Sequence, residues 1–278
     1  MTMDASRTQQ LKQLANQMRI DIIEMLHNVK TGHPGGSLSA VEILISLYYQ
    51  HMKVDCNNPC CGDRDRFIAS KGHCAPVVYV TLANKGFFDK AELKKLRQLG
   101  CMLQGHPDMK QIPGIDMSTG SLGMGLSVGV GMALSAKMDK QDYYTYVLLG
   151  DGELQEGQVW EAAMAASKYG LDHLIAIVDC NGVQLDGRVD EIMPVGDVGK
   201  KFAAFGWHVA ECDGHDITAI DAALDGLKEL QDVPCVLVAR TVKGKGVSFM
   251  EGKNIWHGKA IEEADYKIAM QELGGACQ

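Results

Sequence analysis

The 278-residue sequence has few aromatic residues and no long apolar run. Aromatic residues make up 6% of the chain, although hydrophobic residues as a whole make up 46%. Nowhere is there a continuous apolar stretch of the length that a membrane-spanning helix needs. The N-terminus also lacks the charged and apolar succession of a secretory signal. We therefore expect a globular, cytoplasmic protein with no membrane anchor.

Positive charge is also scarce. The chain has 27 Lys and Arg residues against 35 Asp and Glu residues, which gives a formal net charge of −8. The basic residues are scattered, so we expect no track along which a phosphate backbone would bind. The sequence also contains no internal repeat and no low-complexity segment. These absences argue against a general nucleic-acid-binding protein and against a repeat protein.

The nine cysteines indicate neither a disulfide framework nor a zinc site. An odd number leaves at least one cysteine unpaired, and without an export signal the thiols are most simply reduced. Cys56, Cys60 and Cys61 form the only cluster in the sequence. Their spacing fits no standard zinc pattern, because the second half of a ligand set is missing.

From residue 66 onward, short apolar runs alternate with helical patterns. This alternation predicts an α/β fold in which helices cover both faces of a parallel sheet. In such a fold, ligands bind at the carboxyl edge of the strands. Strands are expected at residues 66–69, 146–149, 174–179, 208–211 and 235–239, and helices at 155–169, 198–205 and 217–230.

The first part of the chain is expected to be helical. Apolar residues over 11–29 fall on one helical face, and Ser6 or Thr8 is available as the cap of that helix. A loop at 31–37 should lead into a second, strongly apolar helix at 41–49.

Length and pattern together favour one domain. A chain of 278 residues can bury one large core, so we expect a single domain over residues 1–278. Its elaborations are an N-terminal helical segment at 6–49 and a C-terminal helix at about 259–273.

The strongest chemical signal is Gly150-Asp151-Gly152, which directly follows an apolar run and precedes Asn181 by one strand–helix–strand unit. A strand that ends in Gly-Asp-Gly carries a carboxylate to the carboxyl edge of the sheet, where glycines let backbone amides approach a phosphate. The next strand brings Asn181 to the same edge. Mg²⁺ takes oxygen ligands from carboxylates, amides, water and the phosphates of its ligand. The spacing therefore predicts a magnesium diphosphate site, with Asp151 and Asn181 as ligands and the amide of Gly152 facing the diphosphate.

Histidines and glycines gather in several short motifs. His33, His73, His106 and His257 each follow or interrupt a glycine-rich loop, although any one of them alone is more simply a loop or capping residue. An imidazole titrates near neutral pH and can therefore donate or accept a proton. The remaining histidines match no motif: His27, His51, His173, His208 and His215.

Taken together, these motifs resemble the transketolase family. The segment 150–187 is similar to the thiamine diphosphate signature of that family, and further motifs occur in the family's order and near its spacing. These are Thr31–Ser37, Ser70–His73, Gly105–Pro107, Ser118–Gly125 and Trp256–Gly258. The resemblance implies a thiamine diphosphate-binding fold, thiamine diphosphate and Mg²⁺ as cofactors, and transfer of a two-carbon ketol unit from a ketose phosphate to an aldose phosphate.

The resemblance also implies roles for individual residues. The backbone oxygen of Val183 would complete the magnesium ligands supplied by Asp151 and Asn181. Residues with catalytic roles would be His33, His106, His257 and Glu156. Residues in contact with the cofactor would be His73, Gly120, Leu122, Gly152, Asn181 and His257. Two positions depart from the common pattern, since Cys180 stands where the family often has Asp or Asn and Ser121 stands where many members have Pro.

Three residues near these motifs allow two interpretations. Glu156 is expected in the opening turn of the helix after the Gly-Asp-Gly strand, where an acid is favourable on local grounds alone. In the family, the equivalent residue joins a carboxylate network across the dimer interface. Lys243 and Lys245 either order a loop over the diphosphate or are simply solvated.

A second chain is expected to complete the active site. A full transketolase is more than twice as long, so this chain resembles the N-terminal subunit of a split transketolase. In the family, the glutamate that activates the cofactor and most contacts to the sugar phosphate come from the missing part. We therefore expect the chain alone to be catalytically silent, and to act with a C-terminal transketolase subunit in an α2β2 assembly.

Alternatives to this interpretation remain open. The same ketol transfer could serve a branched or sulfonated sugar. The chain could instead be the α subunit of a 2-oxo acid dehydrogenase or a fragment of a deoxyxylulose phosphate synthase, although the histidine loops favour transketolase. A non-catalytic cofactor-binding role is the third alternative.

Overall fold

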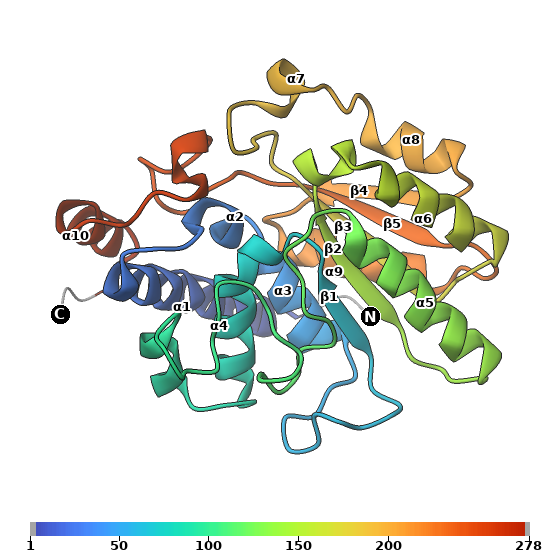
Figure 1. Ribbon diagram of the computed structural model, residues 1–278, viewed down its shortest axis with the longest axis horizontal. Helices are drawn as coiled ribbons and strands as arrows, with labels where there is room; N and C mark the ends of the chain where they lie inside the picture. The colour runs from blue at the N-terminus through green and yellow to red at the C-terminus, as the bar shows by residue number, and fades with distance from the viewer. Residues whose placement is uncertain (1–3, 276–278) are drawn as a thin grey trace.

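A five-stranded parallel sheet forms the centre of the protein, whose computed structural model describes residues 4–275 (Figure 1). The strand order is β1-β2-β3-β5-β4. The predicted α/β fold with a parallel sheet is confirmed, and strand ends differ from the expected ones by only one or two residues. The strands are β1 (Arg66–Ala69), β2 (Thr145–Gly150), β3 (Leu174–Cys180), β4 (His208–Asp213) and β5 (Cys235–Arg240).

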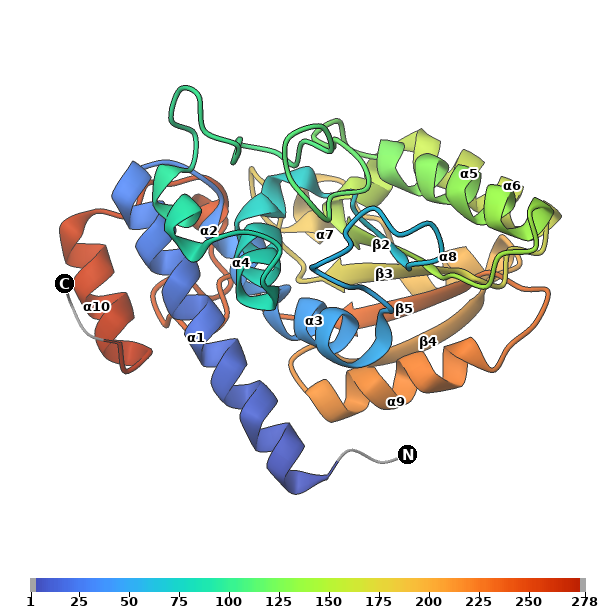
Figure 2. The same cartoon turned by 90° about the horizontal axis from the view of Figure 1, so that it is seen from below.

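Helices cover both faces of the sheet, as predicted (Figure 2). On β3, Ile175 and Ile177 enter one hydrophobic core, whereas Ala176 and Val178 enter the other. Successive strand residues point to opposite faces, so a strand buried on both sides reads as a continuous apolar run. One core packs under α1 (Ala5–Val29), α3 (Val41–Ser46), α4 (Ala75–Lys85) and α9 (Ile217–Lys228), and the other under α5 (Met124–Met138), α6 (Gly157–Lys168) and α8 (Val198–Ala204).

The N-terminal helices differ in detail from the prediction. The cap of α1 is Asp4, whose carboxylate accepts the amide of Arg7 at 2.7 Å, so the expectation of Ser6 or Thr8 was wrong. An ionised carboxylate at this position accepts from the free amides of the first turn. The chain after α1 is also not entirely a loop, because Pro34 starts a short helix, α2 (Pro34–Leu38). Proline suits a first helical position, since its fixed φ is already helical.

One helix of the structure, α4, has no clear periodic signal in the sequence. The helix α4 is buried on nearly all sides, and a segment that is apolar all round shows no amphipathic pattern. The expected helix at 41–49 continues past α3 as a π-helical turn, η1. The remaining short elements are η1 (Leu47–His51), η2 (Gly72–Cys74), η3 (Lys90–Lys95), η4 (Gly152–Gln155), α7 (Val189–Ile192), η5 (Asn254–His257) and α10 (Glu263–Glu272).

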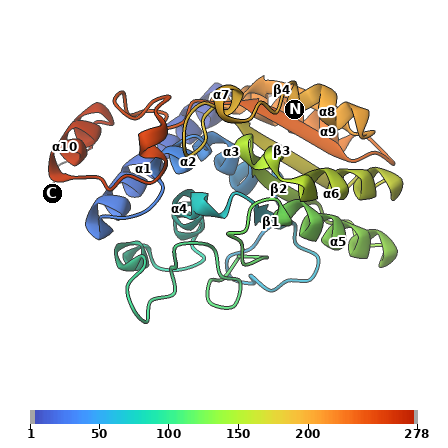
Figure 3. The same ribbon diagram turned by 45° about the horizontal axis from the view of Figure 1, so that its top comes forward.

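The sheet and the N-terminal helices form two neighbouring parts of the molecule. Figure 3 shows α1 and α10 together on one side, and α5 and α6 at the other side. The carboxyl ends of β2 and β3 lie between these parts (Figure 2). The two ends lie side by side, because Gly150 pairs with Asp179 in the parallel register. Within residues 4–275, no helix is both long and apolar enough to cross a membrane.

Candidate functional site

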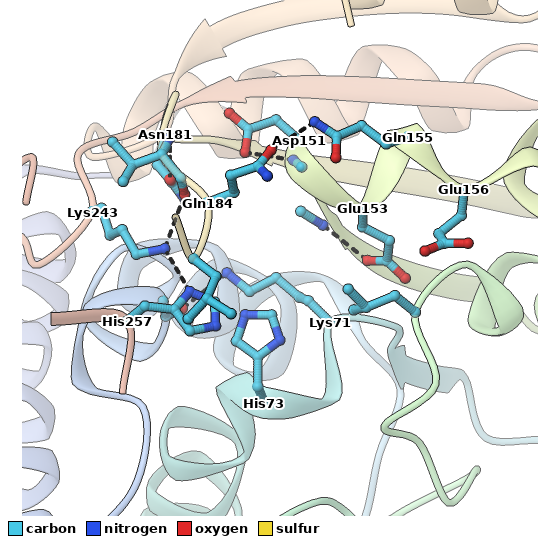
Figure 4. A pocket seen from close by; sticks show the side chains of 16 residues that line it. Lys71, His73, Asp151, Glu153, Gln155, Glu156, Asn181, Gln184, Lys243 and His257 are labelled. Atoms are coloured by element: carbon cyan, nitrogen blue, oxygen red, sulfur yellow. Dashed lines mark hydrogen bonds between the residues drawn. The ribbon is translucent and has the colours of Figure 1, made fainter. Parts of the chain in front are cut away.

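A cavity of about 220 Å³ lies at the carboxyl ends of β2 and β3 (Figure 4). Segments from all along the chain line it, including the motif loops found in the sequence. Its lining residues include Gly36, Lys71, His73, Leu122, Asp151, Gly152, Glu156, Asn181, Val183, Lys243 and His257. The predicted strand-edge location is therefore where the motifs meet.

Asp151 is a buried carboxylate at the end of β2. One of its oxygens accepts the amide of Gly152 at 2.9 Å, and the other accepts the amide of Gly182 at 2.5 Å. Burial raises the pKa of Asp151 to about 6, and the neighbouring Asp179 adds to the rise. Because burial disfavours its charged form, a cation beside Asp151 would relieve that cost.

Asn181 and Val183 face the same cavity from the turn after β3. Gly182 adopts a φ of +74°, which favours glycine and lets the chain reverse there. The side-chain oxygen of Asn181 accepts the amide of Val183 at 3.1 Å, and its nitrogen donates to Asp179 at 3.2 Å. The structure thus brings together an oxygen-bearing side chain from β2 and one from the β3 turn.

A buried ion pair lies beneath these oxygens. Lys71 pairs with Asp179 and donates to the backbone oxygen of Gly36 at 2.9 Å. Burial raises the pKa of Asp179, but the Lys71 ammonium and the hydroxyls of Ser39 and Thr241 outweigh it and hold that pKa below its usual range. Neither member of the pair has a role that the sequence alone indicated. The signal for Lys71 was its place in the Ser-Lys-Gly-His motif after β1.

The four motif histidines form one cluster. The ring centroid of His33 lies 5.4 Å from that of His73, 6.4 Å from that of His106 and 5.3 Å from that of His257. The centroids of His73 and His257 are 4.8 Å apart. These four residues come from four loops far apart in the sequence, so the fold joins what the motifs indicated separately.

The cluster is held neutral at physiological pH. Burial, with the nearby cation Arg97, lowers the pKa of His33 to about 4. Burial and Lys243 lower the pKa of His257 to about 3. The pKa of His73 and of His106 is lowered by the same main cause, burial. Neutral imidazoles each keep one donor and one acceptor nitrogen, so they can exchange hydrogen bonds with a polar ligand.

The Gly120–Gly125 segment bends against this cluster and leads into α5. Gly120 has a φ of +148°, and a Cβ on it would lie 3.3 Å from the ring of His106. Leu122 is exposed and lines the cavity. The buried carboxylate of Glu153, which the sequence analysis missed, accepts the amides of Gly123 at 2.8 Å and Gly150 at 3.1 Å. Glu153 therefore ties this segment to the end of β2.

Glu156 lies outside the histidine cluster. It immediately precedes α6, so the expectation that it lies within the opening turn was one residue off. Its side chain is exposed and makes no capping hydrogen bond. Figure 4 shows it across the cavity from His257.

Lys243 is not solvated, whereas Lys245 is partly exposed. The Lys243 ammonium lies 2.9 Å from the backbone oxygen of Val183 and 3.0 Å from Nδ1 of His257. Burial lowers the pKa of Lys243 to about 8, and the nearby Lys71 contributes to this shift. Lys245 faces Glu251 at 3.5 Å at the surface. The two lysines of this loop therefore have different environments.

Arg97 is a second cation that the sequence analysis missed. Its guanidinium donates to the hydroxyl of Thr31 at 2.8 Å, at the start of the first histidine loop. Its charge lowers the pKa of both His33 and His106. Nothing in the sequence marks Arg97, because it stands between motifs and its position depends on the folding of two loops.

The donor set fits a magnesium diphosphate. Within residues 4–275, no three His, Cys, Asp or Glu side chains converge as a metal site. One carboxylate, one amide oxygen and one backbone oxygen suit Mg²⁺, which takes its other ligands from phosphates and water. Lys71 and Lys243 line the same cavity, where Lys71 is paired with Asp179 and the Lys243 ammonium contacts two neutral groups, the backbone oxygen of Val183 and the ring of His257. A buried nitrogen of His33, Nδ1, has no hydrogen-bond partner among the described residues.

Comparison with known proteins identifies the family. A family model described as "Transketolase, thiamine diphosphate binding domain" matches residues 10–277. The chain is 46% identical to the 6-deoxy-6-sulfo-D-fructose transketolase subunit SqwG of Clostridium sp. (strain MSTE9), covering 95% of this chain and 96% of that protein. It is 43% identical to a subunit of the apulose-4-phosphate transketolase of Phocaeicola vulgatus, covering 96% of this chain and 94% of that protein.

Solved structures agree with this assignment. The transketolase of Campylobacter jejuni superimposes with a TM-score of 0.90 at 34% identity, covering 96% of this chain and 43% of that chain. The chain therefore spans less than half the length of that transketolase, but nearly the whole of the two subunits. Fold, motif order and sequence identity converge on one conclusion: the chain belongs to the transketolase family and comprises its thiamine diphosphate-binding domain.

Proposed function

We propose that this chain is the N-terminal, cofactor-binding subunit of a two-subunit transketolase. With a C-terminal partner subunit, it would transfer a two-carbon ketol unit from a ketose phosphate to an aldose phosphate. The observation that carries the proposal is the convergence of Asp151, Asn181 and Val183 beside the histidine cluster. Support also comes from two relatives that are named as transketolase subunits and match this chain over nearly their full length.

The magnesium ligands are proposed to be the carboxylate of Asp151, the side-chain oxygen of Asn181 and the backbone oxygen of Val183. Two amide hydrogen bonds already orient the Asp151 carboxylate. The amide of Gly152, with His73 and Lys243, would face the diphosphate. Thiamine diphosphate, when bound, supplies the carbon nucleophile that cleaves and forms the bond next to a carbonyl.

The histidines are proposed to serve the substrate. His33 and His106 line no part of the diphosphate cavity, yet the ring of His33 lies against the histidines that do, and His106 lies next to His33. As neutral imidazoles, they would hydrogen-bond sugar hydroxyls and move protons during carbon–carbon cleavage. His257, whose Nδ1 lies 3.0 Å from the Lys243 ammonium, lines the cavity and would contact both the cofactor and the substrate. Gly120 would shape the channel wall, and Leu122 would pack on a ring of the cofactor.

The partner subunit is proposed to complete the active site. Glu156 presents an exposed carboxylate at the rim of the cavity, where a second chain would contact it. The cofactor-activating glutamate would come from that chain. An α2β2 assembly would give each active site walls from more than one chain.

The names of two relatives indicate the class of substrate. The two subunit relatives are named for 6-deoxy-6-sulfo-D-fructose and apulose-4-phosphate. We propose a ketose with one terminal anionic group, either phosphate or sulfonate. Arg97 supports an anionic substrate, because its charge acts on the two histidines that we propose to face the substrate.

The test is affinity capture of this chain from its native extract, followed by a ketol-transfer assay with added thiamine diphosphate and Mg²⁺. We expect cofactor-dependent activity and a co-purifying transketolase subunit. A complex that reductively acylates a lipoyl domain would show a 2-oxo acid dehydrogenase instead. A chain stabilised against heat by ATP and Mg²⁺ but not by thiamine diphosphate and Mg²⁺ would overturn the cofactor assignment.

A further inference from the structure

A buried carboxylate on α3 binds two basic side chains away from the cavity. Glu42 accepts the guanidinium of Arg19 at 2.7 and 2.9 Å, and it lies 3.0 Å from Nδ1 of His215. All three side chains are almost fully buried. The three residues come from α1, α3 and the turn before α9, so only the folded chain assembles them. None of the three belongs to a motif in the sequence.

Both basic residues also hold the loop after β5. The amide of Val242 donates to Nε2 of His215 at 2.8 Å, and Nε of Arg19 donates to the backbone oxygen of Lys245 at 3.0 Å. Because Nε2 accepts a hydrogen bond, the proton of a neutral His215 ring is on Nδ1, where it is donated to Glu42. Through His215 and Arg19, Glu42 is thus linked to the loop on both sides of Lys243.

The loop after β5 also packs closely against α2. The amide of Gly244 donates to the backbone oxygen of Gly35 at 2.9 Å. Gly246 has a φ of +92°, and a Cβ there would lie 2.8 Å from Cδ of Arg19. The loop has little room to shift while Arg19 is in place. Lys243 belongs to the same loop, and its ammonium lies against Val183 and His257.

We infer that Glu42, His215 and Arg19 form a clasp that positions Lys243 for the diphosphate. The inference rests on the proposed function, since it concerns residues outside the cavity that hold the proposed diphosphate site in position. None of the three residues lines the cavity, so they are positioning residues. A buried ionic cluster is a poor source of stability, because well-packed apolar side chains of similar volume serve as well or better. Holding one loop at a defined position is a role that apolar packing would not supply.

The experiment compares variants of the complex of this chain with its partner. His215→Phe keeps a ring but removes both hydrogen bonds, whereas His215→Gln keeps an acceptor for the amide of Val242. His51→Phe is the matched control, because His51 is also a buried histidine, lies 3.2 Å from a carboxylate oxygen of Asp221 on α9 and lines no part of the cavity. For each variant, we would measure the melting temperature without cofactor, the Kd for thiamine diphosphate with Mg²⁺, and kcat at saturating cofactor.

We expect His215→Phe to raise the cofactor Kd about tenfold or more, which is the effect of misplacing one charge-assisted hydrogen bond. His215→Gln should recover most of that loss, and kcat at saturation should stay within about twofold. His51→Phe should lower the melting temperature without changing the Kd. The clasp is overturned if both Phe variants change the Kd equally for an equal loss of melting temperature, or if His215→Gln binds no better than His215→Phe.

A readout without cofactor separates this inference from the proposed function. Acetylation of Lys243 by limiting acetic anhydride, followed by mass spectrometry, reports whether its amine is still held in place. The rate should rise in His215→Phe and stay at the wild-type value in His51→Phe. If the wild-type complex binds no thiamine diphosphate, the proposed function fails. The clasp is also overturned, whatever the cofactor result, if Lys243 is acetylated at the same rate in both Phe variants.

Discussion

The two sides of the cavity are built differently. The metal side consists of Asp151 and Asn181 at the ends of adjacent strands, where the parallel register fixes them. The histidine side consists of rings from four separate segments, and tertiary packing brings the ring of His33 within 6.4 Å of each of the other three. The metal side carries charge, whereas the histidine side is held neutral. Under the proposed function, this contrast separates the residues that would bind the cofactor from those that would serve the substrate.

Asp151→Ala should break the metal side most completely. The substitution removes the only carboxylate among the proposed magnesium ligands, and the phosphates would then lose their shared cation. We expect the complex to retain no thiamine diphosphate, measured as cofactor bound after gel filtration. Asp190→Ala is the control, since Asp190 is an exposed surface carboxylate paired with Arg188. Unchanged cofactor retention in Asp151→Ala would sink the metal assignment.

His106→Ala should break the histidine side and leave the metal side intact. His106 does not line the diphosphate cavity, so the cofactor Kd should stay within about twofold of wild type. Turnover should fall by about a hundredfold, the usual effect of losing a group that transfers protons. Steady-state kinetics at saturating cofactor measure this. Full activity would remove His106 from the substrate channel.

The same contrast explains which features of the fold and of the site the sequence could predict. The sheet and the strand-edge site follow from local patterns, because Gly150-Asp151-Gly152 and Asn181 end strands that the apolar runs already indicate. The helix α4 was missed because it is apolar all round, and the cap of α1 was misplaced because several polar residues precede that helix. Such choices depend on tertiary packing or on one competing hydrogen bond.

Pairs and clusters of residues that form only in the folded chain could also not be predicted from the sequence. Lys71 and Asp179 are 108 positions apart and pair only in the folded chain. His215 matches no motif, and its contacts to Glu42 and Val242 span three segments. The motifs therefore contain most of the residues proposed to bind the cofactor and the substrate, whereas the pairings that hold these residues in place form only in the folded chain.

Lys243→Met should sharpen the comparison, because Lys243 touches both sides. The methionine keeps much of the side-chain volume but removes the cation next to Val183 and His257. We expect the cofactor Kd to rise by about ten- to a hundredfold, since a buried charge-assisted contact is lost. Isothermal titration of the cofactor-free complex measures it. Lys245→Met, on the partly exposed neighbour, should leave the Kd unchanged, and equal losses in both variants would contradict the assignment.

The smallest expected effect is the pH dependence that His33 gives to stability. Its pKa in the folded chain is about 4, below the ordinary value of 6.5, because burial and Arg97 disfavour the imidazolium. Between these values the unfolded chain binds more protons than the folded chain, so lowering the pH shifts the equilibrium toward unfolding. The contribution of His33 is fully present above pH 6.5 and is lost as the pH falls toward 4.

In His33→Asn, which cannot titrate, the melting temperature should therefore fall less steeply over this range. His208→Asn, at an exposed position on β4, should keep the wild-type slope. An unchanged slope in His33→Asn would mean that the histidine side is more hydrated than its packing indicates, and that its rings are not held neutral for substrate.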